Sequence, residues 1–135
     1  KMSCIKALVL GDDSATEIIT TCLEETSTAT SDYGLVTPGE GSVQIDTDPK
    51  NQSHMTVLQL AANKERVEVY VGWSDGIAEP TLTGSDVELP ETRTWSSFEA
   101  ILRKGSPVFA VDAMVNHTIP MKRQSEVIDQ FKVTP

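Results

Sequence analysis

The segment Arg66-Val67-Glu68-Val69-Tyr70-Val71 carries the clearest strand pattern in the chain, because valine occupies every second position. Residues 42–46 alternate in the same way and predict an earlier strand. His54–Ala62 is partly apolar on both faces, which predicts a central strand, and Thr81–Gly84 offers a fourth. The connections between these segments are too short for crossover helices, so we expect antiparallel pairing.

A helical pattern precedes these strands. Ser14-Ala15-Thr16-Glu17 matches a capping box, in which the Ser side chain and the Glu side chain satisfy each other's backbone N–H groups. Apolar residues then recur at helical spacing, at positions Ala15, Ile18, Ile19, Cys22 and Leu23. The Ser/Thr run Thr26–Ser31 and the glycines after it mark a connection. We therefore expect a helix from Ser14, followed by a loop.

The C-terminal third also predicts helices. One is stopped by Gly105-Ser106-Pro107 and carries its apolar residues at helical spacing, namely Trp95, Phe98, Ile101 and Leu102. Residues 108–111 fit a short helix or a strand, of which we favour the helix, and residues 115–119 predict a strand. A terminal helix is expected from Met121. The expected fold is α+β, with a mostly antiparallel sheet of about five strands covered by amphipathic helices.

Length and charge limit the domain organisation and the partners that we expect. The chain has 135 residues, which favours a single domain over residues 1–135, with an N-terminal segment 1–13 and a core 14–132. Its 20 Asp and Glu against 11 Lys and Arg give a net charge of −9, which opposes binding to phosphate backbones, so we expect no nucleic acid partner. No segment approaches the ~18 apolar residues of a membrane span, so we expect no stable membrane insertion.

The cysteines and two glycosylation triplets bear on the compartment in which the protein works. Cys4 and Cys22 fit neither a redox pair nor a zinc site, and they are either two small buried hydrophobic residues or a disulfide. Asn51 and Asn116 begin glycosylation triplets, which matter only in a secreted protein. Such triplets arise by chance in a Ser/Thr-rich chain, so we expect a cytoplasmic location.

The sequence contains no catalytic signature. His54 and His117 have no Cys, Asp or Glu at metal-ligand spacing, and the nucleophile pattern GxSxG does not occur. Gly39-Glu40-Gly41 is too acidic to hold a phosphate. We therefore expect a protein that is not an enzyme and that uses no cofactor or metal.

The order of the expected elements, with a few short segments, resembles the sterol carrier protein type 2 family of lipid-transfer domains. The segments that carry the resemblance are Gly41–Asp46, Pro80–Ser85, Trp95–Gly105 and Ser106-Pro107. The resemblance extends over roughly residues 14–132. It implies an apolar tunnel between sheet and helices that binds a lipid, fatty acyl chain or sterol without catalysis, driven by removal of apolar surface from water.

The resemblance also implies a set of lining residues, drawn from the elements that would border the tunnel. They are Trp95, Phe98, Leu102, Phe109, Met114, Ile128 and Phe131. The same residues fit a filled core without a cavity, and that alternative stays open here. If they line a tunnel, the partner is a hydrophobic small molecule.

A second function fits the same sequence. The two-sided segment His54–Ala62 suits packing on both faces. The chain would then be a structural or interaction module, such as a small viral or accessory protein, that assembles through sheet edges or its terminal helix. Its partner would be another protein or a second copy of itself.

Overall fold

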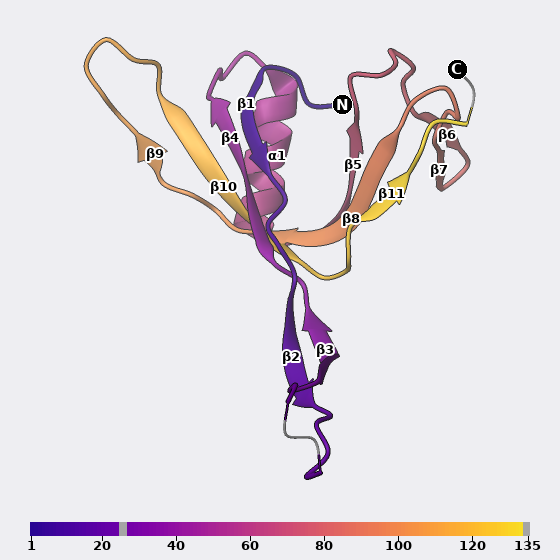
Figure 1. Ribbon diagram of the computed structural model, residues 1–135. Coiled ribbons are helices and arrows are strands. Elements are labelled where there is room, and N and C mark those ends of the chain that lie inside the picture. The colour runs from indigo at the N-terminus through magenta and orange to yellow at the C-terminus, as the bar shows by residue number, and fades with distance from the viewer. Residues whose placement is uncertain (25–26, 134–135) are drawn as a thin grey trace.

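The computed structural model describes residues 1–24 and 27–133, which form an antiparallel β-structure with one helix (Figure 1). In chain order the elements are β1 (Ile5–Val9), β2 (Ser14–Ile19), β3 (Ser31–Thr37), β4 (Glu40–Asp46), α1 (Gln52–Asn63), β5 (Arg66–Gly72), β6 (Thr81–Thr83), β7 (Asp86–Glu88), β8 (Trp95–Leu102), β9 (Pro107–Val108), β10 (Asn116–Arg123) and β11 (Ile128–Gln130). Seven of these strands form the main sheet, whereas β2–β3 and β6–β7 are separate two-stranded hairpins.

The main sheet has the order β1-β4-β10-β8-β11, with β5 also paired to β8 and β9 to β10. The sheet forks, because β8 and β10 pair only where Ala100–Leu102 meets Met121–Arg123. Beyond that junction β10 continues beside β9 and β8 continues beside β11, which gives the two diverging limbs of Figure 1. Every pairing is antiparallel, as the short connections indicate.

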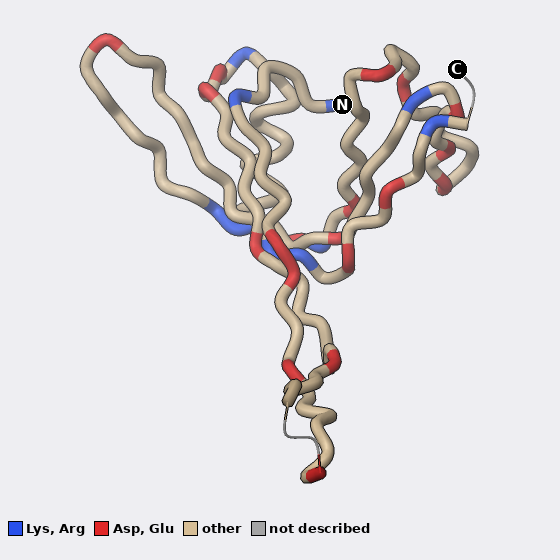
Figure 2. Tube along the Cα trace, viewed as in Figure 1, with Lys and Arg blue, Asp and Glu red and all other residues tan. Residues whose placement is uncertain are grey.

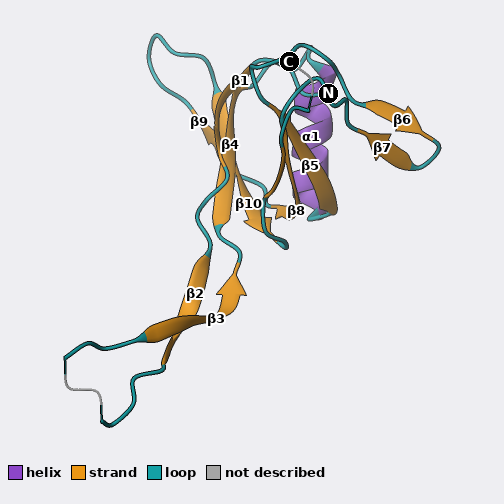
Figure 3. Ribbon diagram, turned by 45° about the vertical axis from the view of Figure 1, so that its right-hand side comes forward, coloured by secondary structure: helices purple, strands orange, loops and turns teal. Residues whose placement is uncertain are grey.

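The core lies between one face of this sheet and α1 (Figure 3). Ile45, Ile119 and Met121 supply large, fully buried side chains from β4 and β10. Phe98 and Leu102 add the inward side of β8. The opposite face of the sheet has no helix upon it within the described residues, and it carries the polar members of each alternating strand.

Helix α1 is defined by its caps. The Asn51 side chain accepts a hydrogen bond from the Ser53 N–H, which satisfies a backbone donor of the first turn. Lys64 adopts a left-handed conformation with φ 54° and ends the helix. His54 is buried beneath the first turn, where its Nδ1 accepts from the Asp48 N–H and its Nε2 donates to the Ser3 carbonyl. The helix thereby ties the start of the chain to the sheet.

The expected α+β fold is wrong, chiefly because Trp95–Leu102 is a strand and not a helix. Trp95, Phe98 and Leu102 fit a helical stripe, but Phe98, Ala100 and Leu102 also alternate, and this second pattern is the one that the core uses. The terminal helix expected from Met121 is likewise replaced by the end of β10 and by β11.

The opposite error occurs at His54–Ala62, which was expected as a central strand and forms α1. The helix expected from Ser14 is strand β2, and Thr26, where its following loop was expected to begin, lies outside the described residues. The short helix expected at 108–111 is absent from the described residues, where β9 and an irregular loop stand instead. The fourth expected strand is β6, which pairs with β7 outside the main sheet.

Strand β1 lies in the expected N-terminal segment 1–13 and pairs with β4, and the single-domain boundaries stay a prediction. Cys4 and Cys22 are both exposed and unpaired, so the expectation of two buried residues is wrong. Among the described residues, none of the helical structure has the length and apolar character needed to cross a bilayer.

Candidate functional site

The most prominent feature outside the core is the hairpin of β2 and β3, which extends away from the main sheet (Figures 1 and 3). We call residues 14–24 and 27–37 the arm. Within the described residues, β2 and β3 pair with each other and with no other strand. Side chains on both strands are almost all exposed. The arm therefore has no core of its own.

Large apolar side chains on the arm are exposed to solvent. Ile19 is 77% exposed, and Tyr33 and Leu35 are each 82% exposed. The register sets Glu17 opposite Tyr33 and Ile19 opposite Ser31, so Glu17, Ile19 and Tyr33 share one face of the hairpin. That face is thus an apolar surface with a carboxylate beside it.

An arm of this kind is unstable without a partner. A two-stranded hairpin is marginally stable in water, because it exposes the apolar side chains that would have to hold it together. Contiguous exposed apolar surface is characteristic of protein interaction sites. The arm's composition and shape indicate that another protein surface covers it in the functional state.

The root of the arm is rigid because Arg123 holds it. The Arg123 side chain, on β10, is buried, with the residue only 3% exposed. Its Nε donates to the Leu10 carbonyl at 2.8 Å, and its Nη2 donates to the Gly11 carbonyl at 3.0 Å and forms an ion pair with Asp13. Its Nη1 donates to the Ser125 carbonyl at 3.1 Å. The guanidinium therefore fixes the backbone where the chain leaves the main sheet.

Asp13 completes this anchor. Its carboxylate accepts hydrogen bonds from Arg123 and from the Gly39 N–H, at the other strand of the arm root. These two donors hold the pKa of the Asp13 carboxyl below its ordinary value of 3.8. The pair therefore keeps its charge throughout the neutral range.

Two glycines let the strands meet closely at the same root. Gly11 has a φ of +78°, and a Cβ there would lie 2.4 Å from the Glu40 carbonyl oxygen. A Cβ at Gly39 would lie 2.2 Å from the Asp12 carbonyl oxygen. Both distances are too short for any side chain, so the crossing needs glycine at both positions.

The seven residues expected to line a lipid tunnel do not come together. Trp95, Phe98 and Leu102 are buried on β8. Phe109 and Met114 lie exposed in the loop between β9 and β10, and Ile128 and Phe131 are exposed near the C-terminal end. Phe131 instead packs edge-on against Trp73, with ring centroids 6.2 Å apart. Whether any of the seven contacts a ligand stays a prediction.

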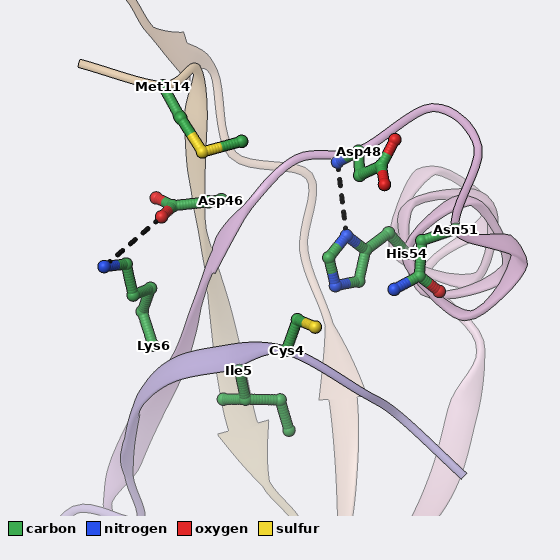
Figure 4. Close-up of a pocket in the computed structure, with 8 residues that line it drawn as sticks. All are labelled: Cys4, Ile5, Lys6, Asp46, Asp48, Asn51, His54 and Met114. Carbon is green, nitrogen blue, oxygen red and sulfur yellow. Dashed lines mark hydrogen bonds and ion pairs between the residues drawn. The ribbon is translucent and has the colours of Figure 1, made fainter. Parts of the chain in front are cut away.

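Two hollows lie near some of these residues. The first, of about 310 Å³, lies between the start of β1 and the segment that leads from β4 into α1, and Met114 is at its edge (Figure 4). The Lys6–Asp46 ion pair, 3.4 Å between Nζ and Oδ2, lies at its rim, and His54 lies at its wall. The second, of about 370 Å³, lies over β5 and β8 and includes Phe98 and Ile128 among its lining residues. Neither holds more than two of the seven.

No group of three or more His, Cys, Asp or Glu side chains within residues 1–24 and 27–133 is arranged to hold a metal ion. The residues that matter at the arm were not singled out by the sequence patterns. Ile19 was assigned to a helical stripe, Tyr33 to a connection, and Arg123 to the expected terminal helix. One signal was available, since no Lys or Arg occurs between Lys6 and Lys50, a stretch that contains the whole arm.

Comparison with known proteins shows the family of this chain. The family model described as phage tail tube, TTP, lambda-like matches residues 1–133, nearly the whole chain. The chain belongs to the lambda-like phage tail tube protein family. It is also 36% identical over 132 residues to structural protein 3 of Pseudomonas phage PAJU2, an alignment that covers 93% of this chain and 79% of that relative.

Membership of the tail tube family corrects the sequence-based assignment. The resemblance to sterol carrier proteins is wrong, because it depended on an order of helices that the structure replaces with strands. Lipid binding, the function that the resemblance implied, is wrong for the same reason. The alternative of a structural module, of the viral kind, is the one that the family supports.

Proposed function

We propose that this chain is a building subunit of a phage tail tube and that it assembles with copies of itself. Its role is structural, without catalysis, and its principal partner is a second copy of the chain. The observation that carries the proposal is the uncovered arm, whose apolar face needs a protein surface. Membership of the tail tube family supports the proposal that this protein surface belongs to another subunit. A cytoplasmic location stays a prediction.

The arm supports an open-ended assembly and not a simple closed dimer. It leaves the main sheet on one side, and the rest of the molecule lies on the other (Figure 1). A contact between the arm of one copy and a different surface of the next is heterologous, and heterologous contacts generate rings or filaments. A tube is an assembly of this class.

The main sheet offers a further means of contact. Within the described residues β1 pairs with β4 alone and β5 pairs with β8 alone, so each has one edge of unpaired backbone N–H and C=O groups. Unpaired edges are templates for pairing with another chain. The two edges therefore support the proposal that copies join side by side.

The double variant Ile19→Asp, Tyr33→Asp tests the proposal. Charge on the apolar face of the arm should abolish assembly into tubes, read by sedimentation and negative-stain electron microscopy. The main sheet does not depend on either residue, so the far-ultraviolet circular dichroism and melting temperature of the isolated subunit should be retained.

The matched control is Ile19→Val, Tyr33→Phe, which keeps the apolar surface and should assemble normally. Tubes formed by the Asp variant at the concentrations that suffice for the unaltered chain would contradict the role given to the arm. A chain that stays monomeric at every concentration would contradict self-assembly itself.

A further inference from the structure

Charge is strongly segregated along this chain. No Lys or Arg lies between Lys6 and Lys50, and the described arm residues carry Glu17, Glu24 and Asp32. Figure 2 shows the arm with red segments and no blue ones, whereas blue segments, with red ones beside them, lie at the point where the arm leaves the main sheet. An arm with only negative charge binds best to a positively charged surface.

Such a surface lies at the junction of β8, β9 and β10. Arg103 and Lys104 follow β8, and Lys122 lies on β10. All three side chains are exposed. We call Arg103, Lys104 and Lys122 the basic cluster.

The register places two members of the basic cluster on one face of the sheet. Lys122 lies opposite Ile101, and the Arg103 N–H donates to the Pro120 carbonyl. Their neighbours Met121 and Leu102 point into the core, so Lys122 and Arg103 point to the other face, away from α1. That face is open for contact.

The basic cluster has an acidic neighbour in Glu40, which lies opposite Lys122 in the register of β4 and β10. Arg103 Nη2 lies 3.5 Å from Glu40 Oε1, and both side chains are more than half exposed. Exposed pairs of this kind contribute little to stability. Lys104 and Lys122 make no ion pair with any residue that the structure describes.

We propose that the basic cluster of one subunit receives the acidic arm of a second copy. This inference rests on the proposed self-assembly and names the surface to which the arm docks. The occupant is a second copy because the subunit's own arm is directed away by its anchor. Arg123 and Asp13 fix its root, and Figures 1 and 3 show the arm extending outward from the sheet.

The two surfaces also match in apolar character. On the arm, Glu17 shares a face with Ile19 and Tyr33. On the sheet, Ile101 lies between the strands that carry Lys122 and Arg66, half-buried on the same face. A carboxylate beside apolar residues thus meets ammonium and guanidinium groups beside an apolar residue. Each subunit donates one arm and accepts one, which propagates the assembly.

Two charge-reversed proteins test this assignment. The cluster variant is Arg103→Glu, Lys104→Glu, Lys122→Glu, and the arm variant is Glu17→Lys, Glu24→Lys, Asp32→Lys. Each variant alone places like charges against one another, so the protein concentration needed for assembly should rise roughly tenfold or more. Mixed in equal amounts, the two variants should assemble again, because each supplies the charge that the other's partner surface needs.

The mixture also controls for folding, since misfolded subunits would not recover on mixing. Lys50→Glu, Lys64→Glu removes basic residues outside the cluster and should assemble like the unaltered chain. Failure of the mixture to assemble would overturn the docking site. Normal assembly of the cluster variant would also overturn the docking site. If the Ile19→Asp, Tyr33→Asp variant then still failed to assemble, self-assembly through the arm would stand and only the docking site would be wrong.

A nucleic acid is the other class of molecule that a basic surface can attract. If the basic cluster served a phosphate backbone, the cluster variant would assemble normally and would lose affinity for a short DNA duplex that the unaltered chain binds. That combination would overturn the inference. We expect no duplex binding by either protein, because the chain carries a net charge of −9.

Discussion

Arg123 shows how a single residue sets the geometry of the arm. Five donors on a planar guanidinium are presented to three carbonyls and one carboxylate, and the side chain is excluded from water. A lysine could not reach these acceptors together, because its ammonium is a single point of charge. The direction in which the arm leaves the sheet therefore depends on one side chain from a strand more than a hundred residues later in the chain.

Replacing this residue should destabilise the whole subunit. Arg123→Met retains the apolar part of the side chain and leaves the Leu10, Gly11 and Ser125 carbonyls without their donor. We expect the free energy of unfolding to fall by roughly 3 kcal/mol. Urea denaturation of the isolated subunit measures this change.

The adjacent exposed residue provides the comparison. Lys122→Met should alter the free energy of unfolding by less than about 0.5 kcal/mol, because its side chain makes no buried contact. Equal effects of the two substitutions would show that Arg123 does not hold the arm root.

Among the elements, β8 is the centre of the sheet and the place where strand and helix patterns conflict. It pairs with β5 along most of its length, and with β10 and β11 in its two halves. Phe98, Ala100 and Leu102 point to the core, whereas Glu99 and Ile101 point to the polar face. A helix would place Ile101 on the buried apolar stripe, whereas the strand places it on the outer face of the sheet.

Alanine substitutions in β8 separate the two geometries. Phe98→Ala should lower the free energy of unfolding by about 3–5 kcal/mol, since it removes a buried aromatic ring. Ile101→Ala should cost much less, about 1 kcal/mol, because that side chain is only half-buried on the outer face. Both are read from chemical denaturation. Similar losses at the two positions would favour the helical stripe and contradict the strand.

The sequence predicted β4 and β5 correctly because their alternation was the only regular pattern in those segments. Val43 and Ile45 have no competing helical spacing, and neither do the three valines of β5. In residues 95–102 both periods are present, and local spacing does not tell which one the core will use. Burial decided between them, and burial is a property of the whole fold.

Helix α1 was missed for a related reason. Leu58 and Leu60 alternate, but His54, Leu58 and Ala61 also recur at helical spacing, and the first and last of these are buried. The preceding Asn51 was available as an N-cap signal and would have favoured the helix.

The arm could not be predicted from hydrophobic periodicity at all. A period arises because one face of an element is buried, and β2 has no buried face within the subunit. The apparent stripe at Ile18, Ile19 and Cys22 therefore carried no information on secondary structure. Residues 7–49 lack Lys and Arg, and this charge pattern indicates an interaction segment without indicating its secondary structure.

At the scale of the whole molecule, the subunit is incomplete by itself. Within the described residues it exposes an arm without a core and the unpaired edges of β1 and β5. The basic cluster lies beside the arm root, while the charged residues of the arm are all acidic. Exposed apolar side chains and unpaired strand edges are unfavourable in a monomer, and they become contacts in an assembly. Such an assembly is what we propose for this member of the tail tube family.

Hydrogen–deuterium exchange of the backbone amides in β2 and β3, compared between isolated subunits and assembled tubes, tests this account most directly. In the isolated subunit we expect these amides to exchange rapidly, because a lone hairpin opens readily. In tubes they should become protected, to an extent comparable with the amides of β8. Arm amides that exchange as fast in the tube as in the free subunit would contradict the claim that a second copy covers the arm.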